Sequence, residues 1–205
     1  MVKFLAHRFL KPHIYSPNIN HINFEYLQSQ LGIKVLIFDK DDTLTLHHIG
    51  EIYHGLNPSK IEEISSLFKN NAFICSNSRR KWRIDYGKNN ELIHKNQTFQ
   101  SILTKYKKPF NFSDLTHQIA EKLEYHPKPN EICIVGDRLL TDVLLARYNN
   151  CLSIFVDGFP ESVRSSDLQI LRELEAKHLV CDFPQKSVLI PQFHSKTIEG
   201  EKLFA

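Results

Sequence analysis

Long apolar runs are absent from this 205-residue chain, and so is any strong imbalance of charge. No apolar run is long enough to span a bilayer. The formal net charge of +3 is too small to indicate nucleic-acid binding by itself. We find no internal repeat and no low-complexity tract, and the length fits one domain with a sizeable core. These absences exclude repeat, fibrous and membrane-spanning classes and leave a globular domain.

Cysteine is also scarce, with four residues and no Cys-x-x-Cys pair. Cys75, Cys133 and Cys151 lie in or beside apolar runs, and Cys181 stands apart. We therefore expect reduced, buried thiols in a reducing compartment, and neither a disulfide framework nor a zinc site.

The most informative segment is the apolar run 35–38, which is followed by Asp39, Lys40, Asp41, Asp42 and Thr43. The run is typical of a buried strand. In extended backbone, residues i and i+2 leave the same face, so Asp39 and Asp41 can point together while Lys40 points away. Two carboxylates held that close repel each other unless a cation lies between them. Oxygen ligands of this kind favour Mg²⁺.

Three further polar motifs follow in order. The apolar run 71–75 ends at Ser76, a lysine, Lys108, precedes a proline, and the run 131–135 leads into Gly136, Asp137 and Asp142. Each motif alone has a structural explanation, as a cap, a solvated lysine or an acid at a helix N-terminus. It is improbable that purely structural explanations hold for all four motifs together, in this order along the chain. A receiver domain, another fold with aspartates at strand ends, lacks Asp-x-Asp-x-Thr.

Strands and helices alternate along the chain, which predicts an α/β fold with a mostly parallel sheet and helices on both faces. The expected strands are 35–38, 71–76, 131–135 and 151–156. Helices are expected after Asn57-Pro58, after Asn111 or Ser113, over 141–148, and from Ser165 or Ser166. The stretch 78–100 has no clear pattern. We expect an N-terminal segment over 1–25, a catalytic domain over 26–185 and an irregular tail over 186–205. In such sheets the site lies at the carboxyl ends of the strands.

The four motifs resemble the signatures of the haloacid-dehalogenase-like (HAD) phosphohydrolases, whose fold is three-layered and Rossmann-like. Little sequence separates the first two motifs, and the segment between Ser76 and Lys108 is short. A large cap domain is therefore not expected. Among these enzymes, absence of a cap implies a bulky or surface-bound substrate such as a lipid head group, a protein or a nucleic-acid end.

Longer strings are similar to the phosphatidylglycerophosphate phosphatases of this superfamily, which produce phosphatidylglycerol on the route to cardiolipin. The matching strings are Phe-Leu-Lys-Pro-His-Ile-Tyr-Ser-Pro (9–17), Leu-Gly-Ile-Lys (31–34), Phe-Asp-Lys-Asp-Asp-Thr-Leu-Thr (38–45), Cys-Ser-Asn-Ser (75–78), Lys-Lys-Pro (107–109) and Val-Gly-Asp-Arg-Leu-Leu-Thr-Asp (135–142). One departure is Asp42, where the family usually carries Asn; this position points away from the metal in the family pattern.

The resemblance implies a mechanism and a role for each site residue. Asp39 is the expected nucleophile, Asp41 the general acid and base, and Lys108 the cation that offsets charge on the phosphoryl group. Mg²⁺ is the expected cofactor, held by the Asp39 carboxylate, the Asp41 main-chain carbonyl and Asp137. The same resemblance implies that Asp142 belongs to the metal site, where it orients Lys108 or a metal-bound water or ligates Mg²⁺ directly, and that Ser76 binds a phosphoryl oxygen. Asn77 and Arg138 adjoin these motifs, so we expect them to contact substrate.

The first residues suggest how the protein meets a lipid substrate. Residues 2–11 contain no acid, and Lys3, His7, Arg8 and Lys11 fall on one arc of a helical wheel. A short basic amphipathic helix suits an anionic membrane surface, although the same pattern fits a first helix packed on the sheet or a remnant of a targeting peptide. We expect peripheral binding to phospholipid, no nucleic-acid partner, and a place on the matrix side of the mitochondrial inner membrane, with plastid or cytoplasm as alternatives.

Two other functions remain open from the sequence. A capless phosphatase of the same superfamily can act on protein or nucleic-acid phosphomonoesters. A catalytically silent membrane scaffold on this fold is the second, but a scaffold has no need of Asp39, Asp41, Lys108 and Asp137 together.

Overall fold

The computed structural model describes residues 10–46, 52–77, 91–94 and 97–159, together with 169, 170, 173 and 175. The expected helix over 2–11 lies almost wholly outside these residues, as do Cys181, the tail over 186–205 and most of the final helix. In the part that is described, no helix has the length and apolar character needed to cross a membrane.

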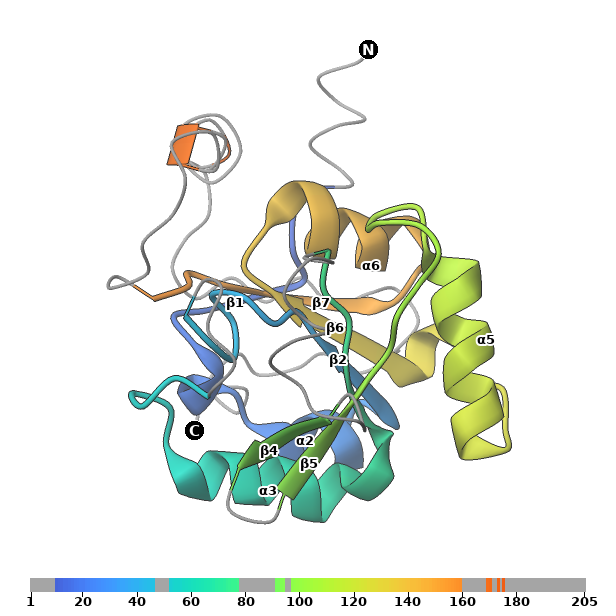
Figure 1. The fold of residues 1–205 in the computed structure, drawn as a ribbon, viewed down its shortest axis with the longest axis horizontal. Helices are drawn as coiled ribbons and strands as arrows, with labels where there is room; N and C mark the ends of the chain where they lie inside the picture. The colour runs from blue at the N-terminus through green and yellow to red at the C-terminus, as the bar shows by residue number, and fades with distance from the viewer. Residues whose placement is uncertain are drawn as a thin grey trace.

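Seven strands form a single sheet (Figure 1). They are β1 (Ile14–Ser16), β2 (Val35–Phe38), β3 (Ala72–Ile74), β4 (Glu91–His94), β5 (Gln97–Ser101), β6 (Ile132–Gly136) and β7 (Leu152–Val156). Their order across the sheet is β1-β7-β6-β2-β3-β5-β4, and all neighbours are parallel except β4 and β5, which pair antiparallel. The predicted α/β class with a mostly parallel sheet is confirmed.

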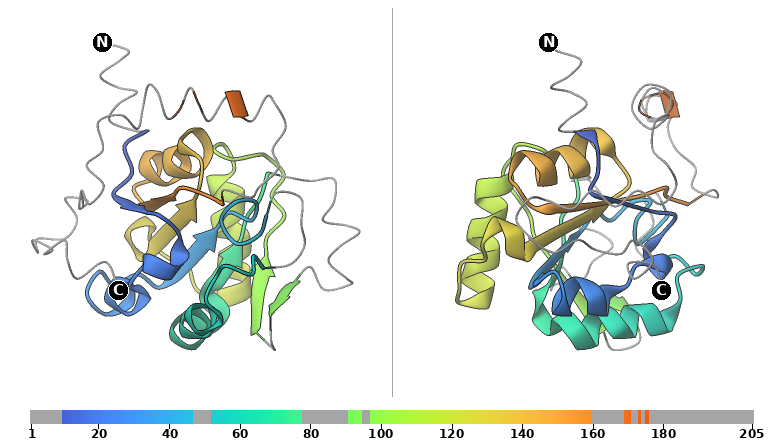
Figure 2. Two further views of the ribbon diagram at one scale, coloured as in Figure 1. Left: turned by 90° about the vertical axis from the view of Figure 1, so that its left-hand side faces the viewer. Right: turned by 180° about the vertical axis from the view of Figure 1, so that it is seen from behind.

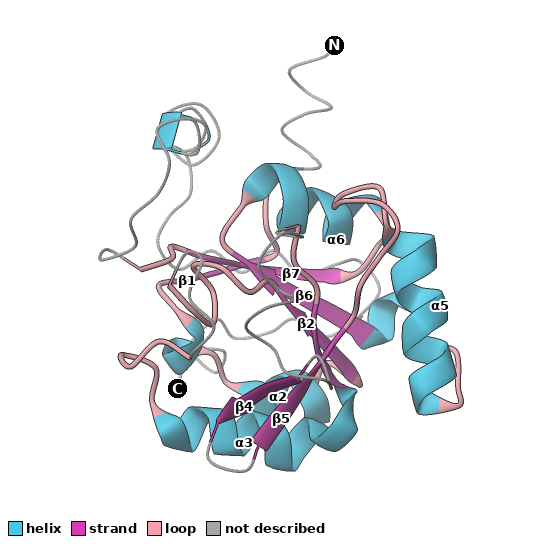
Figure 3. Cartoon of the chain, viewed as in Figure 1, coloured by secondary structure: helices cyan, strands magenta, loops and turns pink. Residues whose placement is uncertain are grey.

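Helices cover both faces of this sheet, as predicted (Figures 2 and 3). Leu36 and Phe38 of β2 pack with α2 (Phe24–Ser29) and α3 (Pro58–Phe68). Val35 and Ile37 point to the opposite face and pack with α5 (Phe112–Leu123) and α6 (Leu144–Tyr148). The alternation of side chains along β2 therefore supplies both halves of the core, which is why the whole strand is apolar and buried.

The N-terminal part of the described chain belongs to this domain. β1 is an edge strand paired with β7, and Ile14, Ile19, Phe24 and Leu27 are all buried in the core. The sequence predicts the start of the catalytic domain at residue 26, so part of the sheet and core precedes the expected boundary. β1 itself is not predicted, because three residues are too few for a period-2 pattern to show in the sequence.

The helix starts follow the expected capping only in part. Asn57 caps α3, its side chain accepting a hydrogen bond from the Ser59 amide at 3.0 Å, with Pro58 in the first turn. Asn111 occupies the N-cap position of α5, but its side-chain amide donates to Thr104 Oγ1 at 2.9 Å and to Cys75 Sγ at 3.3 Å. Asn111 therefore ties the start of α5 to the end of β3.

The helix expected over 141–148 begins earlier, as a π-helical turn (Leu139–Val143) that continues into α6. The unpatterned stretch before Lys108 contains the hairpin of β4 and β5. Within the described ranges, α3 and a short 3-10 turn lie between β2 and β3, and the hairpin is the only element between β3 and Lys108. Neither connection contains a cap domain in the part of the chain that the structure describes. Cys75, Cys133 and Cys151 are buried and free, as predicted.

Candidate active site

The four sequence motifs follow four strands that are neighbours in the sheet. Asp137 follows β6, Asp39 follows β2, Ser76 lies just beyond β3, and Lys108 lies in the segment after β5. These strands occur in the order β6-β2-β3-β5 and run parallel, so their carboxyl ends share one edge. Topology therefore brings together residues that are up to 98 positions apart in the sequence.

Three carboxylates meet at this edge. Asp39, Asp137 and Asp142 are all buried, and each has a carboxylate oxygen within 4.8 Å of a carboxylate oxygen of the other two. Asp39 follows β2 and is held to the neighbouring β6, because its amide donates to the Val135 carbonyl at 2.8 Å. Asp142 comes from the π-helical turn, where its amide donates to the Arg138 carbonyl at 3.0 Å. The cluster is thus assembled by main-chain hydrogen bonds on both sides.

Lys108 is the cation of this cluster. Its Nζ lies 2.7 Å from Asp39 Oδ1 and 2.5 Å from Asp142 Oδ1, and the residue is only 5% exposed. Burial by itself lowers the pKa of Lys108, but the carboxylates of Asp142 and Asp39 outweigh it and hold this pKa above its usual value. Lys108 is therefore charged and bridges two of the three acids.

Burial has the opposite effect on Asp142, because it disfavours the carboxylate and raises the pKa of this group, a shift that Lys108 partly reverses. Asp142 also packs directly on Gly136, whose missing side chain makes room for it. A Cβ atom at position 136 would lie 2.6 Å from Cβ of Asp142, well inside van der Waals contact. Glycine at the end of β6 is thus a requirement of the acid cluster.

Asn77 holds the main chain that carries Lys108. Its Oδ1 accepts from the Lys108 amide at 2.7 Å, and its Nδ2 donates to the Lys108 carbonyl at 3.2 Å. The sequence predicts a substrate contact for Asn77. Because both polar ends of its side chain are engaged with Lys108, the geometry favours a positioning role.

Asp41 is buried but lies outside the group of three carboxylates. The strand ends at Phe38, and the chain then turns: the amides of Leu44 and Thr45 both donate to the Lys40 carbonyl, at 2.9 and 3.0 Å. Strand alternation therefore no longer places Asp41 on the face of Asp39. Its carboxylate instead lies 3.7 Å from Nζ of Lys40, a lysine that is itself 2% exposed. The main-chain carbonyl of Asp41 remains the expected metal ligand.

Asp42 lies in the same turn and has a φ of 64°. Asparagine and aspartate tolerate this left-handed conformation better than other side chains apart from glycine. The Asn that the family resemblance leads us to expect and the Asp of this chain therefore meet the same backbone requirement.

Ser76 and Arg138 lie half-buried beside the cluster. Ser76 follows Cys75, whose amide donates to the Phe38 carbonyl at 2.9 Å and so keeps this segment against the end of β2. Arg138 adjoins Asp137, and its Nε is buried with no hydrogen-bond partner among the described residues. The substrate contacts expected of Ser76 and Arg138 stay predictions.

The donor set fits a divalent cation. Three carboxylates and the one ammonium of Lys108 leave two formal negative charges in a buried site. Like charges held this close disfavour the ionised state unless a cation balances them, and carboxylate oxygens are ligands that Mg²⁺ accepts. Asp39 and Asp137 are the residues that would hold it, with Asp142 turned toward Lys108.

Glu175 is a member of the site region that sequence reasoning missed. It is 4% exposed, and its carboxylate accepts hydrogen bonds from the amides of Leu139 at 3.4 Å and Leu140 at 3.2 Å. These amides lie between Asp137 and Asp142, so Glu175 helps to fix the turn that separates them. The sequence around Glu175 gives no sign of this role, because the contact with Leu140 spans 35 positions along the chain.

Comparison with known proteins agrees with this geometry. The family described as mitochondrial PGP phosphatase matches residues 1–159. Phosphatidylglycerophosphate phosphatase 1, chloroplastic/mitochondrial, of Arabidopsis thaliana is 26% identical over 171 residues, which are 82% of this chain and 47% of the relative. The chloroplastic phosphatidylglycerophosphate phosphatase 1 of Chlamydomonas reinhardtii is 28% identical over 168 residues, 80% of this chain and 59% of the relative.

The chain thus spans about half the length of the curated relatives that it matches. No solved structure matches it significantly. The family match covers residues 1–159 and includes Asp39, Lys108, Asp137 and Asp142. On this evidence the chain belongs to the mitochondrial PGP phosphatase family.

Proposed function

We propose that this protein is a Mg²⁺-dependent phosphatase that hydrolyses the terminal phosphomonoester of phosphatidylglycerophosphate to give phosphatidylglycerol. The observation that carries the proposal is the buried cluster of Asp39, Asp137 and Asp142 around Lys108, at the carboxyl ends of four adjacent strands. Membership of the family and the names of the two curated relatives support the substrate.

In the first step, a carboxylate oxygen of Asp39 attacks the phosphorus atom in line with the leaving oxygen. The bond between phosphorus and the glycerol oxygen breaks, and an aspartyl-phosphate forms. Asp41 gives its proton to the departing alkoxide. In the second step, Asp41 takes a proton from a water molecule, and the resulting hydroxide attacks phosphorus. Asp39 is regenerated and inorganic phosphate leaves.

Lys108 contributes fixed positive charge throughout both steps. Because its Nζ is already 2.7 Å from Asp39 Oδ1, little reorganisation is needed when negative charge develops on the phosphoryl oxygens. Ser76 donates a hydrogen bond to one of these oxygens. When bound by Asp39, the Asp41 carbonyl and Asp137, Mg²⁺ supplies further charge neutralisation.

Arg138 has the chemistry to bind the second phosphate of the substrate, the phosphodiester. Its guanidinium can make two parallel hydrogen bonds to a phosphate group, and its Nε lacks a partner among the described residues. Selectivity for a lipid with two phosphates over a simple phosphomonoester therefore depends on Arg138 in this proposal.

The protein is proposed to act peripherally on an anionic membrane, on the matrix side of the mitochondrial inner membrane, with plastid or cytoplasm as alternatives. The basic residues of the N-terminal segment, Lys3, Arg8 and Lys11, support membrane attraction. Phospholipid is the partner that this proposal requires, and nucleic acid is not.

Phosphate release from phosphatidylglycerophosphate in mixed micelles tests the proposal. Glycerol 3-phosphate and a phosphoserine peptide are the comparison substrates, with Mg²⁺ present. We expect clear preference for the lipid, and Asp39→Asn as the matched inactive control, losing several orders of magnitude in kcat with its fold intact.

Equal or better turnover of the peptide, or of phosphorylated DNA ends, would instead support the second candidate, a capless phosphatase of protein or nucleic-acid phosphomonoesters. Failure to hydrolyse even an aryl phosphate would leave only the silent scaffold. Retention of a tenth of wild-type activity by a clean Asp39→Asn preparation would overturn the assigned nucleophile.

A further inference from the structure

The segment that carries Lys108 into the site also exposes large hydrophobic side chains. Leu103 is 51% exposed, Tyr106 56% and Phe110 84%. Five large hydrophobic residues are exposed in the described part of the chain, and three of them lie within residues 103–110. This stretch between β5 and α5 is called the docking segment below.

The docking segment is also basic. Lys105 and Lys107 are exposed, and residues 103–110 contain no acid. Nζ of Lys105 lies 5.4 Å from the centre of the Tyr106 ring, so charge and aromatic surface are combined. Tyrosine, phenylalanine and lysine together are typical of the interface between lipid head groups and acyl chains.

The backbone of this segment is held in place by hydrogen bonds. The Thr104 hydroxyl donates to the Tyr106 carbonyl at 2.7 Å, the Phe110 amide donates to the Lys107 carbonyl at 2.9 Å, and Asn77 binds the main chain of Lys108. The Lys105 amide donates to the Asp114 carboxylate at 2.5 Å. Tyr106 and Phe110 are therefore presented outward by an ordered turn.

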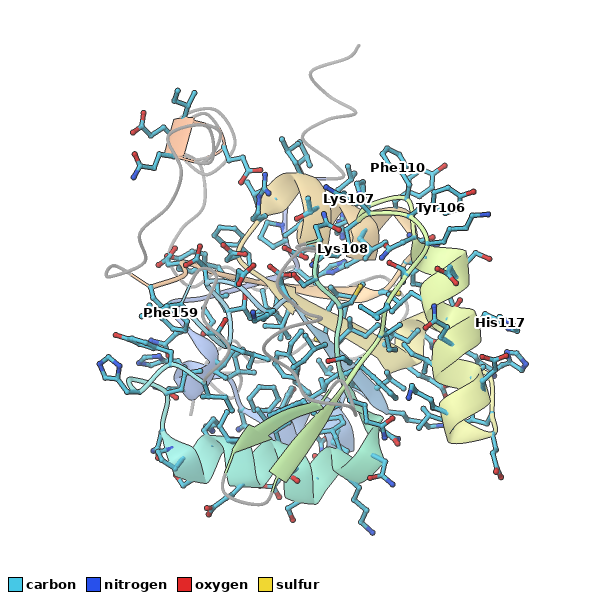
Figure 4. The ribbon with its side chains drawn as sticks, viewed as in Figure 1. Tyr106, Lys107, Lys108, Phe110, His117 and Phe159 are labelled. Atoms are coloured by element: carbon cyan, nitrogen blue, oxygen red, sulfur yellow. The ribbon has the colours of Figure 1, made fainter. Side chains whose placement is uncertain are left out.

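The exposed rings of this turn lie close in the chain to the catalytic lysine. Tyr106 and Phe110 flank Lys108 by two residues on each side, and Lys108 Nζ lies 2.7 Å from the nucleophile Asp39. Figure 4 shows Tyr106 and Phe110 at the outer edge of the molecule near the start of α5, with Lys107 and Lys108 further in. A surface that contacts the two rings is therefore only two residues along the chain from the lysine that reaches Asp39.

We propose that residues 103–110 dock the protein on an anionic lipid bilayer, with Phe110 and Tyr106 inserted at head-group depth and Lys105 and Lys107 facing lipid phosphates. This inference rests on the proposed lipid substrate. A phospholipid keeps its acyl chains in the bilayer, so its phosphomonoester reaches Lys108 only if the rim of the site meets the membrane. Basic charge on the segment matches the negative surface that such a substrate creates.

The first experiment measures co-sedimentation with vesicles of phosphatidylglycerol and phosphatidylcholine. We expect the double variant Tyr106→Ser/Phe110→Ser to bind at least about tenfold more weakly than the wild type, the scale for losing one buried aromatic side chain. Tyr148→Ser is the matched control, because Tyr148 is 71% exposed but ends α6, which leads back to the start of β7, opposite the site. It should bind as the wild type does.

Turnover separates docking from chemistry. The double variant should retain wild-type kcat and KM on p-nitrophenyl phosphate, and lose activity only on phosphatidylglycerophosphate in vesicles. Lys105→Gln/Lys107→Gln should weaken the binding to anionic vesicles and reduce its dependence on salt. Lys122→Gln/Lys128→Gln, at the opposite end of the domain, is the charge-matched control.

Depth of insertion provides a direct readout. The chain contains one tryptophan, Trp82, so Phe110→Trp in a Trp82→Phe background carries a single indole at the docking segment. Brominated lipid should quench its fluorescence on vesicle binding. Tyr148→Trp in the same background should not be quenched.

Each opposite result has a definite meaning. Wild-type binding by Tyr106→Ser/Phe110→Ser, absence of vesicle binding by the wild type, or equal quenching of both indoles overturns the docking proposal. Loss of p-nitrophenyl phosphate turnover in the double variant does so too, because the segment would then only position Lys108. If vesicle binding depends on both rings but the wild type does not hydrolyse phosphatidylglycerophosphate, the docking surface stands and the proposed substrate fails.

Discussion

Lys108 is the residue on which the electrostatics of the site depend most. It is buried between Asp39 and Asp142, and the two contacts, at 2.7 and 2.5 Å, differ little. Removing one partner of a buried ion pair leaves an uncompensated charge, which costs about 3–5 kcal/mol. The positive charge of Lys108 therefore offsets part of the repulsion among the three carboxylates that are buried together.

Asp41→Asn should harm lipid substrates more than aryl phosphates. The glycerol alkoxide is a poor leaving group and needs a proton, whereas nitrophenolate leaves with little help. A loss of about 10²–10⁴-fold is therefore expected on the lipid, and a smaller loss on the aryl phosphate. Steady-state kinetics on both substrates measure the difference. Equal losses would show that Asp41 acts in metal geometry or in hydrolysis of the phosphoenzyme instead.

Gly136→Ala should lower both kcat and Mg²⁺ affinity, because the added methyl overlaps Asp142 and pushes it away from Lys108. Overlap of this kind in a packed site also costs stability, typically about 1–3 kcal/mol. Gly32→Ala is the control: Gly32 has a φ of 69° and nothing within 4 Å of its would-be Cβ, so this variant should lose stability through backbone strain alone. Thermal unfolding and kcat on p-nitrophenyl phosphate separate the two, and a loss of kcat in Gly32→Ala would contradict the steric argument.

At the scale of elements, the local sequence pattern predicts the strands in the centre of the sheet, but it does not predict the short elements near the N-terminus. β2 is predicted to the residue, and β3, β6 and β7 within two residues, since buried parallel strands are continuous apolar runs. β1 and α2 are missed because three and six residues are too short for a period to show. The roles of Asn77 and Glu175 are missed for another reason, since each depends on a contact more than 30 residues away.

His13 lies just before β1 and is hydrogen-bonded to Ser153 of β7. The residue is 3% exposed; its amide donates to Ser153 Oγ at 2.9 Å, and its Nδ1 accepts from the Ser153 amide at 3.0 Å. Burial, and after it the charge of Arg147, lowers the pKa of His13 to about 3. The folded state thus keeps this ring neutral at pH values where the unfolded chain, with a pKa near 6.5, takes up a proton.

Stability should therefore be full above about pH 6.5 and decline as the pH falls toward 3, by about 2 kcal/mol for His13 between pH 7 and pH 5. His13→Asn keeps an acceptor near the position of Nδ1 but does not titrate, so its free energy of unfolding should fall less over this range. Denaturant unfolding at pH 7 and pH 5 measures both slopes. His117→Asn, on the exposed surface of α5, is the control and should keep the wild-type slope. Equal slopes for the wild type and His13→Asn would contradict the argument.

At the scale of the whole molecule, the order of strands is what makes the site. The motifs occur along the chain in the order β2, β3, β5, β6, but the sheet places β6 beside β2 and so closes the set around Asp39. The sequence predicts that the motif residues lie at one edge of the sheet, because the carboxyl ends of parallel strands lie at the same edge. It does not predict that the chain turns directly after Phe38, which places the Asp41 carboxylate 3.7 Å from Nζ of Lys40. Acids from separate strands are thus buried together at one edge, so repulsion there lowers the stability of the entire domain.

Metal binding should therefore raise the stability of the whole domain. Two formal negative charges remain in the cluster after Lys108 is counted, and a divalent cation balances them. A ligand that binds only the folded state at 100 times its Kd adds about 2.7 kcal/mol, or roughly 5–10 °C in Tm for a chain of this size. After treatment with a chelator, Mg²⁺ should restore this increment.

Asp137→Asn should be more stable than the wild type without metal, and its Tm should not respond to Mg²⁺. Asp157→Asn, a change outside the cluster, should respond to Mg²⁺ fully. A Tm that Mg²⁺ leaves unchanged in the wild type, or raises equally in Asp137→Asn, would show that the three acids do not form the metal site.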